Sequence, residues 1–281
     1  MITPTAVSGY LIEWLPKQVT GNIHSVFSSS LNLMVSGRLI HIGSDLHPLS
    51  CLGITLAHED MLRLTRSALP QNRVVVKNQQ LRIYTYDRTA TIDCSYSRPL
   101  DLRASPTAPE GEIQGLLEAL NALDLHTHIG ISWNNELKKA LEALSVPASD
   151  KEVKQAMCWL LGRGKGLTPS GDDILMGYGA AQWLFGGGSH YCNKLLSVIR
   201  HQTTEVSLAY LQALCDGWLN EDYINLFHAA RDGDRQKYPM LLEQIQHMGH
   251  TSGSDSLLGF KAALSGGENW RFYHESIDRT L

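Results

Sequence analysis

The first candidate for chemistry is a polar loop, GRGKGLTPSGDD, which runs from Gly162 to Asp173. Within it, Gly164 and Gly166 flank the cation of Lys165. Because glycine has no side chain, backbone N–H groups in such a loop can approach a ligand closely. The N-terminus of a following helix also favours negative charge. The residue types therefore predict an anion-binding loop at the start of a helix.

Two familiar phosphate-binding loops do not fit this stretch. A Walker A loop needs a Lys followed by Ser or Thr after a strand, whereas Lys165 is followed by Gly166 and a predicted helix precedes the loop. The glycine fingerprint of dinucleotide-binding folds does not fit either, because these glycines have a different spacing and no predicted strand precedes them. A simple capping box, with Ser170 as N-cap and Asp173 three residues later, is the competing interpretation. Capping explains these two residues but not the glycines, so anion binding is favoured.

A second stretch, GHTSGSDSLLGF at 249–260, repeats the pattern. The matched residues of the two copies are Thr168 and Thr251, Ser170 and Ser252, Gly171 and Gly253, and Asp173 and Asp255. Each Ser is predicted to be an N-cap, each Gly to leave the first turn of amides open, and each Asp to lie at the third helical position. If the two helix N-termini converge, they form one pocket lined by hydroxyls and amides. The alternative is two independently capped helices.

Asp172 is the carboxylate that capping explains least. Its counterpart in the second copy is Ser254, which carries no charge. Asp172 and Lys165 are therefore predicted to be catalytic, with Asp172 either orienting the Lys165 ammonium or accepting a proton from the substrate. Asp172, Asp173 and Asp255 also offer oxygen ligands for a magnesium ion beside a phosphate, although the predicted chemistry requires no metal or other cofactor.

Two further polar runs add weaker candidates. TTEVSLAYL places Thr204 and Ser207 three residues apart on one predicted helix face, where they either meet a ligand or bond to the helix's own carbonyls. HSVFSSSLNL begins at His24 and suits either a polar pocket or the turn of a hairpin. His126 and His128 lack an evident third ligand and are interpreted as surface histidines.

The composition is that of an ordinary globular protein, with 281 residues, 43% hydrophobic and 19% charged. A formal net charge of −4 argues against nucleic acid as a partner. Five scattered cysteines without a CxxC pair indicate reduced, mostly buried thiols. The sequence has neither a signal-like N-terminus nor a run long enough to span a membrane. It therefore predicts a soluble cytoplasmic protein with no membrane partner.

The chain changes character partway along, which predicts an α+β fold. A β-rich N-terminal domain is expected over 1–105, with hairpins LNLMV/RLIHI and RVVV/LRIYTY, a strand in TATIDCS and a helix at 58–67. A proline-containing linker at 97–109 leads into an α-helical domain, 106–281, which carries the paired motifs. Apolar spacing predicts its helices at 111–123, 134–144, 150–161, 171–186, 191–218, 221–231, 238–248 and 254–265.

The motifs GKGLTPSGDD and GHTSGSDSLLGF resemble those of a family long catalogued as a domain of unknown function and associated with a subunit of oxamate carbamoyltransferase. TTEVSLAYL and HSVFSSSLNL fit the family too, so the resemblance covers most of the chain. It implies a multi-subunit enzyme of allantoin breakdown, which converts oxalurate and phosphate into oxamate and carbamoyl phosphate. It also implies partner subunits, one of them related to acyl-CoA synthetases. A paralogue that acts on another carbamoyl or acyl substrate is the nearest alternative.

The predicted site suits a small anionic substrate of this kind, a carbamoyl compound together with phosphate. Phosphorolysis of a carbamoyl group needs a fixed phosphate and preorganised donors for the carbonyl oxygen. Hydroxyls supply such donors and Lys165 supplies charge. Two readings from other classes stay open: a non-catalytic subunit whose glycine loop docks partners, and a stand-alone protein that binds a small carboxylate or a nucleotide.

Overall fold

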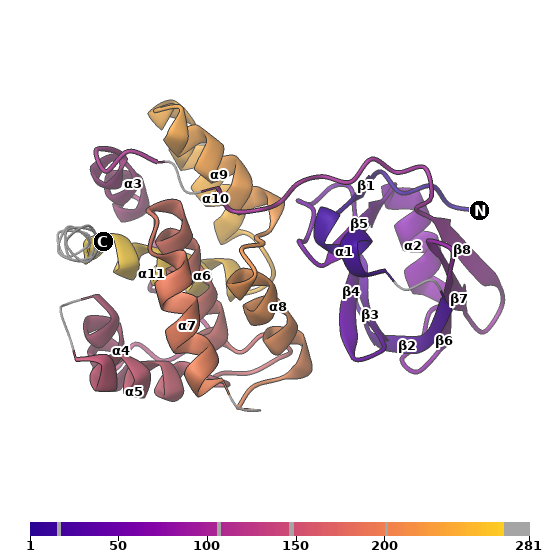
Figure 1. Ribbon diagram of the computed structural model, residues 1–281, viewed down its shortest axis with the longest axis horizontal. Helices are drawn as coiled ribbons and strands as arrows, with labels where there is room; N and C mark the ends of the chain where they lie inside the picture. Colours follow the sequence, from indigo (N-terminus) through magenta and orange to yellow (C-terminus); the bar gives the residue numbers. More distant parts are fainter. Residues whose placement is uncertain (16–17, 106–107, 146–148, 200–201, 267–281) are drawn as a thin grey trace, which may run out of the picture. The chain divides into compact units, whose positions relative to one another are not determined.

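The computed structural model describes residues 1–15, 18–105, 108–145, 149–199 and 202–266. The chain divides into two units. The first contains Met1–Arg103 and a short return, Trp218–Glu221, and the second contains Ala104–Gly217 and Asp222–Leu281. The expected α+β fold is confirmed, since a curled sheet precedes a helical part (Figure 1).

Within the described residues, the N-terminal unit is built on an eight-stranded sheet in the order β1-β5-β4-β3-β2-β6-β7-β8. The strands are β1 Ala6–Val7, β2 Gln18–Val26, β3 Ser30–Val35, β4 Arg38–Ser44, β5 Gly53–Leu56, β6 Arg73–Lys77, β7 Gln80–Tyr84 and β8 Thr89–Asp93. Neighbouring strands are antiparallel except β4 and β5. Both predicted hairpins are confirmed. In the first, Ser36 and Gly37 make the turn with φ of 51° and 73°, values that suit a tight hairpin.

The first residues of the chain pair with both edges of this sheet. Ala6 pairs with Thr55 of β5, and Ile2 bridges to Ile92 of β8. The sheet therefore curls until one short segment joins its two ends, as Figure 1 shows. Alternate side chains point into the enclosed core, in which residues such as Ile23 are fully buried.

Two helices complete the regular structure of this unit. α2, His58–Ser67, spans the predicted residues and buries Met61 and Leu64 against the core of the sheet. α1, Gly9–Trp14, was not predicted, because six residues are too few for a helical periodicity to be recognised.

Two side chains of the return Trp218–Glu221 accept hydrogen bonds from backbone N–H groups of the N-terminal unit. The carboxylate of Glu221 accepts a hydrogen bond from the N–H of Leu49 at 2.7 Å. The side-chain oxygen of Asn220 accepts one from the N–H of Cys51 at 3.0 Å. A segment distant in sequence thus belongs to the N-terminal unit.

The second unit is helical in the part that the structure describes. Its helices are α3 Glu112–Asn121, α4 Asn135–Ser145, α5 Asp150–Leu160, α6 Ser170–Leu184, α7 Gly188–Val198, α8 Glu205–Cys215, α9 Glu221–Arg231, α10 Tyr238–Gln246 and α11 Ser252–Ser265. The single helix predicted at 191–218 is wrong. The hydroxyl of Thr204 accepts a hydrogen bond from the N–H of Ser207 at 3.0 Å, so a new helix, α8, begins there.

The centre of the helical unit is the crossing of α6 and α11. A Cβ on Gly177 would lie 1.7 Å from the carbonyl oxygen of Ser256, and one on Gly259 would lie 1.9 Å from that of Ile174. The two helices therefore touch backbone to backbone, and only glycine fits at either position. This close crossing fixes where the first turns of α6 and α11 lie.

Side-chain burial agrees with one expectation from composition. All five cysteines are free thiols, and Cys51, Cys94 and Cys192 are buried. Among the residues that the structure describes, no helix has the length and apolar character needed to cross a lipid bilayer.

Candidate functional site

The paired motifs meet at the crossing of α6 and α11. The hydroxyl oxygens of Thr168, just before α6, and Ser252, the first residue of α11, are 3.1 Å apart. The predicted convergence of the two helix N-termini is therefore confirmed. It brings together the polar residues of both copies, which we call the crossing cluster: Thr168, Ser170, Asp173, Thr251, Ser252 and Asp255.

The predicted N-caps are wrong. Pro169 and Thr251 occupy the N-cap positions, and neither side chain caps a backbone N–H of its helix. Ser170 and Ser252 are instead the first residues of α6 and α11. Their hydroxyls are therefore available for partners outside their own first turn.

Those partners are the acids of the opposite copy. Ser170 hydrogen-bonds to Asp255, and Ser252 hydrogen-bonds to Asp173. The capping boxes expected within each helix are absent at these described residues, because each carboxyl group finds its serine across the crossing. These two hydrogen bonds between the helices link their N-termini into one polar cluster.

The glycines after the two serines serve packing. A Cβ on Gly171 would lie 2.0 Å from the carbonyl oxygen of Leu160, and one on Gly253 would lie 1.9 Å from that of Ile245. The N–H of each glycine already donates to a loop carbonyl, at 2.8 and 3.0 Å. The prediction that these glycines leave amides open to a ligand is therefore wrong.

Asp173 holds the unsatisfied group of the crossing cluster. Its side chain is 9% exposed, and its Oδ2 atom has no hydrogen-bond partner among the described residues. Burial raises the pKa of Asp173 well above its usual value, and the nearby Asp255 and Asp172 raise it further. Hydrogen bonds from Ser252 and Thr168 oppose that rise in pKa. A buried polar atom without a partner is unfavourable, so this oxygen has the capacity to bind a ligand.

Asp255 lies deeper and is fully paired. It is 0% exposed, and its Oδ1 and Oδ2 accept the N–H of Gly130 at 3.0 and 3.2 Å. Burial raises the pKa of Asp255, while hydrogen bonds from Gly130, Ser170 and Thr251 lower it. A Cβ on Gly130 would lie 2.4 Å from the Ser170 hydroxyl and 2.6 Å from that of Thr251. The cluster thus accepts only glycine at this position without a shift.

Sequence reasoning missed Gly130. It lies 125 residues before Asp255, in an irregular stretch ahead of α4. The sequence contained one signal, since an isolated glycine between Ile129 and Ile131 indicates that the backbone closely approaches a neighbouring group. The partner depends on the tertiary fold and has no local signature.

Asp172 faces the glycine loop rather than the crossing cluster. Its Oδ1 accepts the N–H of Gly162 at 2.8 Å, and its Oδ2 accepts the hydroxyl of Thr203. The side chain is 1% exposed, and burial raises its pKa, opposed by Thr203, Gly162 and Ser207. Both oxygens are engaged, so the geometry gives Asp172 a role in positioning the loop. Its predicted catalytic role stays a prediction.

Thr204 and Ser207 also support this loop. The hydroxyl of Thr204 donates to the carbonyl of Leu167, and Thr204 is the N-cap of α8. Ser207 is 2% exposed and hydrogen-bonds to Asp172. The two hydroxyls therefore lie beside the loop, but Thr204 precedes the helix instead of sharing a face with Ser207.

The glycines of the loop have left-handed backbone conformations. The φ angles of Gly162, Gly164 and Gly166 are 70°, 131° and 90°. A Cβ on Gly164 would lie 2.5 Å from the backbone nitrogen of Ser170, whereas one on Gly166 would meet nothing within 4 Å. Gly164 therefore packs against α6, and Gly166 leaves the backbone open.

The two cations of the loop differ in their contacts. Arg163 stacks its guanidinium 4.0 Å from the ring centre of Trp159 and donates to the carbonyl of that residue. Lys165 is exposed, and within the described part of the chain its ammonium has no ion-pair or hydrogen-bond partner. Lys165 is thus the cation beside the loop with charge to offer a ligand.

Two family models match the chain. The model described as oxamate carbamoyltransferase subunit AllH matches residues 160–264, which contain both motifs and their crossing. The model described as the AllH family N-terminal domain matches residues 4–99. The chain belongs to the AllH family. The resemblance that the motifs predicted is confirmed, and the chain is of the oxamate carbamoyltransferase subunit type. No solved structure matches it.

One predicted residue of this AllH-family chain lies in the other unit. His24 belongs to β2, where the pairing with β3 is irregular, and its Nδ1 lies 3.2 Å from the hydroxyl of Ser25. The remaining predicted site residues are in the helical unit. The structure therefore gives His24 a local partner within the N-terminal unit, and its predicted role in a site stays a prediction.

The acids Asp172, Asp173 and Asp255 form no ion pair with any described lysine, arginine or histidine. The described residues also contain no group of three or more side chains arranged to hold a metal ion. Magnesium binding stays a prediction.

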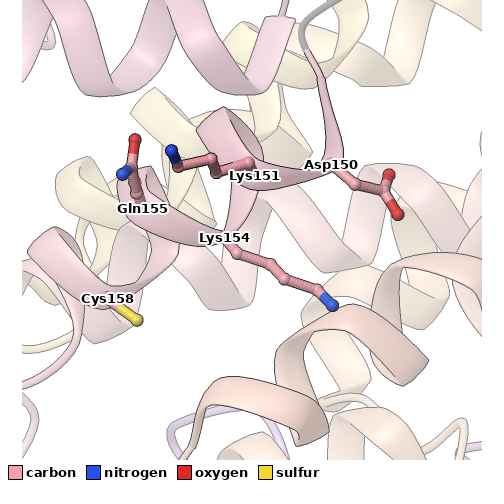
Figure 2. A pocket seen from close by; sticks show the side chains of 5 residues that line it. All are labelled: Asp150, Lys151, Lys154, Gln155 and Cys158. Carbon is pink, nitrogen blue, oxygen red and sulfur yellow. The ribbon is translucent and has the colours of Figure 1, made fainter.

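A separate hollow of about 520 Å³ lies on the surface of α5 (Figure 2). Its lining residues are Asp150, Lys151, Lys154, Gln155 and Cys158. None of them belongs to the crossing cluster or to the glycine loop. The candidate site is therefore defined separately from this hollow, by the Oδ2 atom of Asp173 that has no partner among the described residues.

Proposed function

We propose that this chain is the subunit of an oxamate carbamoyltransferase that binds the carbamoyl substrate, and that it does so at the crossing cluster. The complex would convert oxalurate and phosphate into oxamate and carbamoyl phosphate. The observation that carries the proposal is the buried Oδ2 of Asp173, which no described residue pairs, beside the hydroxyls of Thr168 and Ser252. The family description supports the enzyme and implies partner subunits.

The chemistry needs a proton at one nitrogen. Phosphate attacks the carbamoyl carbon of oxalurate, the bond from that carbon to the oxamate nitrogen breaks, and this nitrogen must gain a proton. Burial keeps Asp173 protonated to a higher pH than an exposed aspartate, which suits a general acid. After the transfer, the Asp173 carboxylate accepts a hydrogen bond from the new N–H of oxamate.

The anionic groups of the reactants would lie toward the glycine loop. Lys165 offers there a positive charge that no described residue pairs, and Gly166 leaves its backbone open. The hydroxyls of Thr168 and Ser252 hydrogen-bond to Asp173, and when Asp173 is protonated either of them would donate instead to the carbonyl oxygen as it gains charge. In this arrangement the amides of Gly171 and Gly253 have no direct role, because both are already bonded.

The test is phosphate-dependent cleavage of oxalurate by the purified chain, alone and with its partner subunits, combined with titration of oxamate. We expect oxamate to bind the chain and the complex to turn over. In Asp173→Asn the turnover should fall while the complex still assembles, and the exposed change Glu142→Gln serves as the matched control. A complex that turns over equally well with Asp173→Asn would contradict the proposal and favour a docking role for this subunit.

A further inference from the structure

The two halves of the crossing match position by position. The matched residues are Ser170 and Ser252, Gly171 and Gly253, Asp173 and Asp255, and Gly177 and Gly259. Each residue makes a contact equivalent to that of its counterpart, whether with a helix backbone or with the opposite copy. The cluster therefore has a local near-twofold arrangement with two equivalent carboxyl positions.

The halves differ in the group that meets the carboxyl. At Asp255, a peptide N–H from Gly130 donates to both oxygens, at 3.0 and 3.2 Å. At Asp173, Oδ2 is unpaired within the described residues, although the side chain is only 9% exposed. A bound group that brings an N–H to this oxygen would remove the free-energy cost of leaving it unpaired. The chain itself shows, at the equivalent position, that an amide fits such a carboxyl.

We propose that the amide end of the substrate lies against Asp173, in the position that the Gly130 peptide group occupies at Asp255. The inference rests on the proposed function and adds which end of the substrate faces the acid. The N–H of oxamate, like that of oxalurate, is a planar amide donor of the same kind as a peptide N–H. Asp173 is then a specificity-determining residue that distinguishes an amide from a carboxylate.

The charges of the cluster favour this orientation. Asp172 and Asp255 lie close enough to Asp173 to raise its pKa. No described cation forms an ion pair with any of the three acids. Once Asp173 has given up its proton, a carboxylate placed against it would add a further negative charge to a buried site, whereas an amide is neutral. The carboxylate end of the substrate would point away from the acids, toward the exposed charge of Lys165.

The test compares the binding of oxamate, oxalate and N,N-dimethyloxamate to the full chain by isothermal titration calorimetry. Oxalate replaces the amide by a second carboxylate of similar size, and N,N-dimethyloxamate has no N–H. We expect each to bind roughly 10-fold to 100-fold more weakly than oxamate, the scale of one lost hydrogen bond to a buried polar group. Asp173→Asn places an NH₂ donor where an acceptor stood, so the preference for oxamate over oxalate should narrow or reverse. Glu142→Gln should leave it unchanged.

The outcomes separate this inference from the proposed function. Equal affinity for oxamate and N,N-dimethyloxamate, or an unchanged oxamate-to-oxalate ratio in Asp173→Asn, overturns the inference and leaves the proposed function standing. If oxamate fails to bind both to the chain and to the assembled complex, both are overturned. If Asp173→Asn does not fold, the affinities of the three compounds for the unaltered chain still test whether an amide N–H is required for binding.

Discussion

The first and second copies of the motif are alike in their backbones and unlike in their polar partners. Gly177 and Gly259 make the same contact with the opposite helix. The carboxyl group of Asp255 accepts the N–H of Gly130, whereas Oδ2 of Asp173 has no hydrogen-bond partner among the described residues. The shared glycines therefore build the crossing, and the difference in what meets each carboxyl group leaves the candidate site at Asp173. The glycines of both copies are expected to matter for folding, and the carboxyl group that no described peptide N–H meets is expected to matter for binding.

The largest expected effect tests whether the copies are equivalent in packing. Gly259→Ala places a methyl group about where a carbonyl oxygen now lies, 1.9 Å from the ideal Cβ position. We expect it to lower the free energy of unfolding by about 4 kcal/mol or more, as severe overpacking does. Gly177→Ala should cost a similar amount. Urea unfolding measures both, and a large difference between them would show that the two contacts are not equivalent.

The second test separates the adjacent acids. Asp173→Asn should lower turnover of the assembled enzyme by ~10²-fold, the scale of lost acid–base assistance, with a melting temperature at least as high as before. Asp172→Asn instead weakens the bonds to Gly162 and Thr203, so it should lower stability by about 1–3 kcal/mol. Turnover and thermal melting, measured on both variants, distinguish a catalytic acid from one that positions the loop. An inactive but fully stable Asp172→Asn would restore the sequence-based assignment of Asp172 as the catalytic acid.

A third test uses pH to separate the site from the scaffold. Because burial raises the pKa of Asp173 in the folded state, its contribution to stability is present below about pH 4, the unfolded pKa. That contribution is lost as the pH rises through the higher folded pKa. Asp173→Asn cannot ionise, so its stability relative to the unaltered chain should increase with pH. Urea unfolding between pH 4 and 8 checks the sign, and a constant difference would contradict the assignment.

The smallest expected effect concerns the open glycine of the loop. Gly166→Ala adds a side chain at a φ of 90° but meets no atom within 4 Å, so it should cost only about 1 kcal/mol of stability from backbone strain. Gly166→Val should also block approach to the loop backbone and weaken phosphate binding, with far-UV circular dichroism nearly unchanged. Phosphate affinity equal to that of the original chain would exclude the loop backbone as a contact.

Local signals predicted the elements well. Hairpins follow from turn residues between apolar runs, and α2 and α9 have the residue bounds that apolar spacing predicted. The repeated motif also predicted that the two helix N-termini meet. Ser170 and Ser252 carry the sequence signature of an N-cap, yet their carboxyl partners lie in the other helix. The sequence pattern does not distinguish a local partner from a distant one.

The same limit explains what was missed. From the sequence, Asp172 is interpreted as an acid without a structural partner. Its partners, Gly162 and Thr203, depend on how the loop folds back on α6 and α8. Gly130 contacts Asp255 through a peptide N–H, which every residue except proline carries. Backbone contacts of this kind leave almost no trace in residue type.

The return of Trp218–Glu221 into the N-terminal unit has a consequence for synthesis on the ribosome. The ring of Trp218 lies 5.6 Å from that of Tyr10, and Leu219 donates its N–H to the carbonyl of Leu102. These contacts join the earliest part of the chain to residues that are translated much later. A nascent chain that has emerged only to residue 105 therefore lacks part of the first unit, which reaches its final structure only after most of the helical unit has been made.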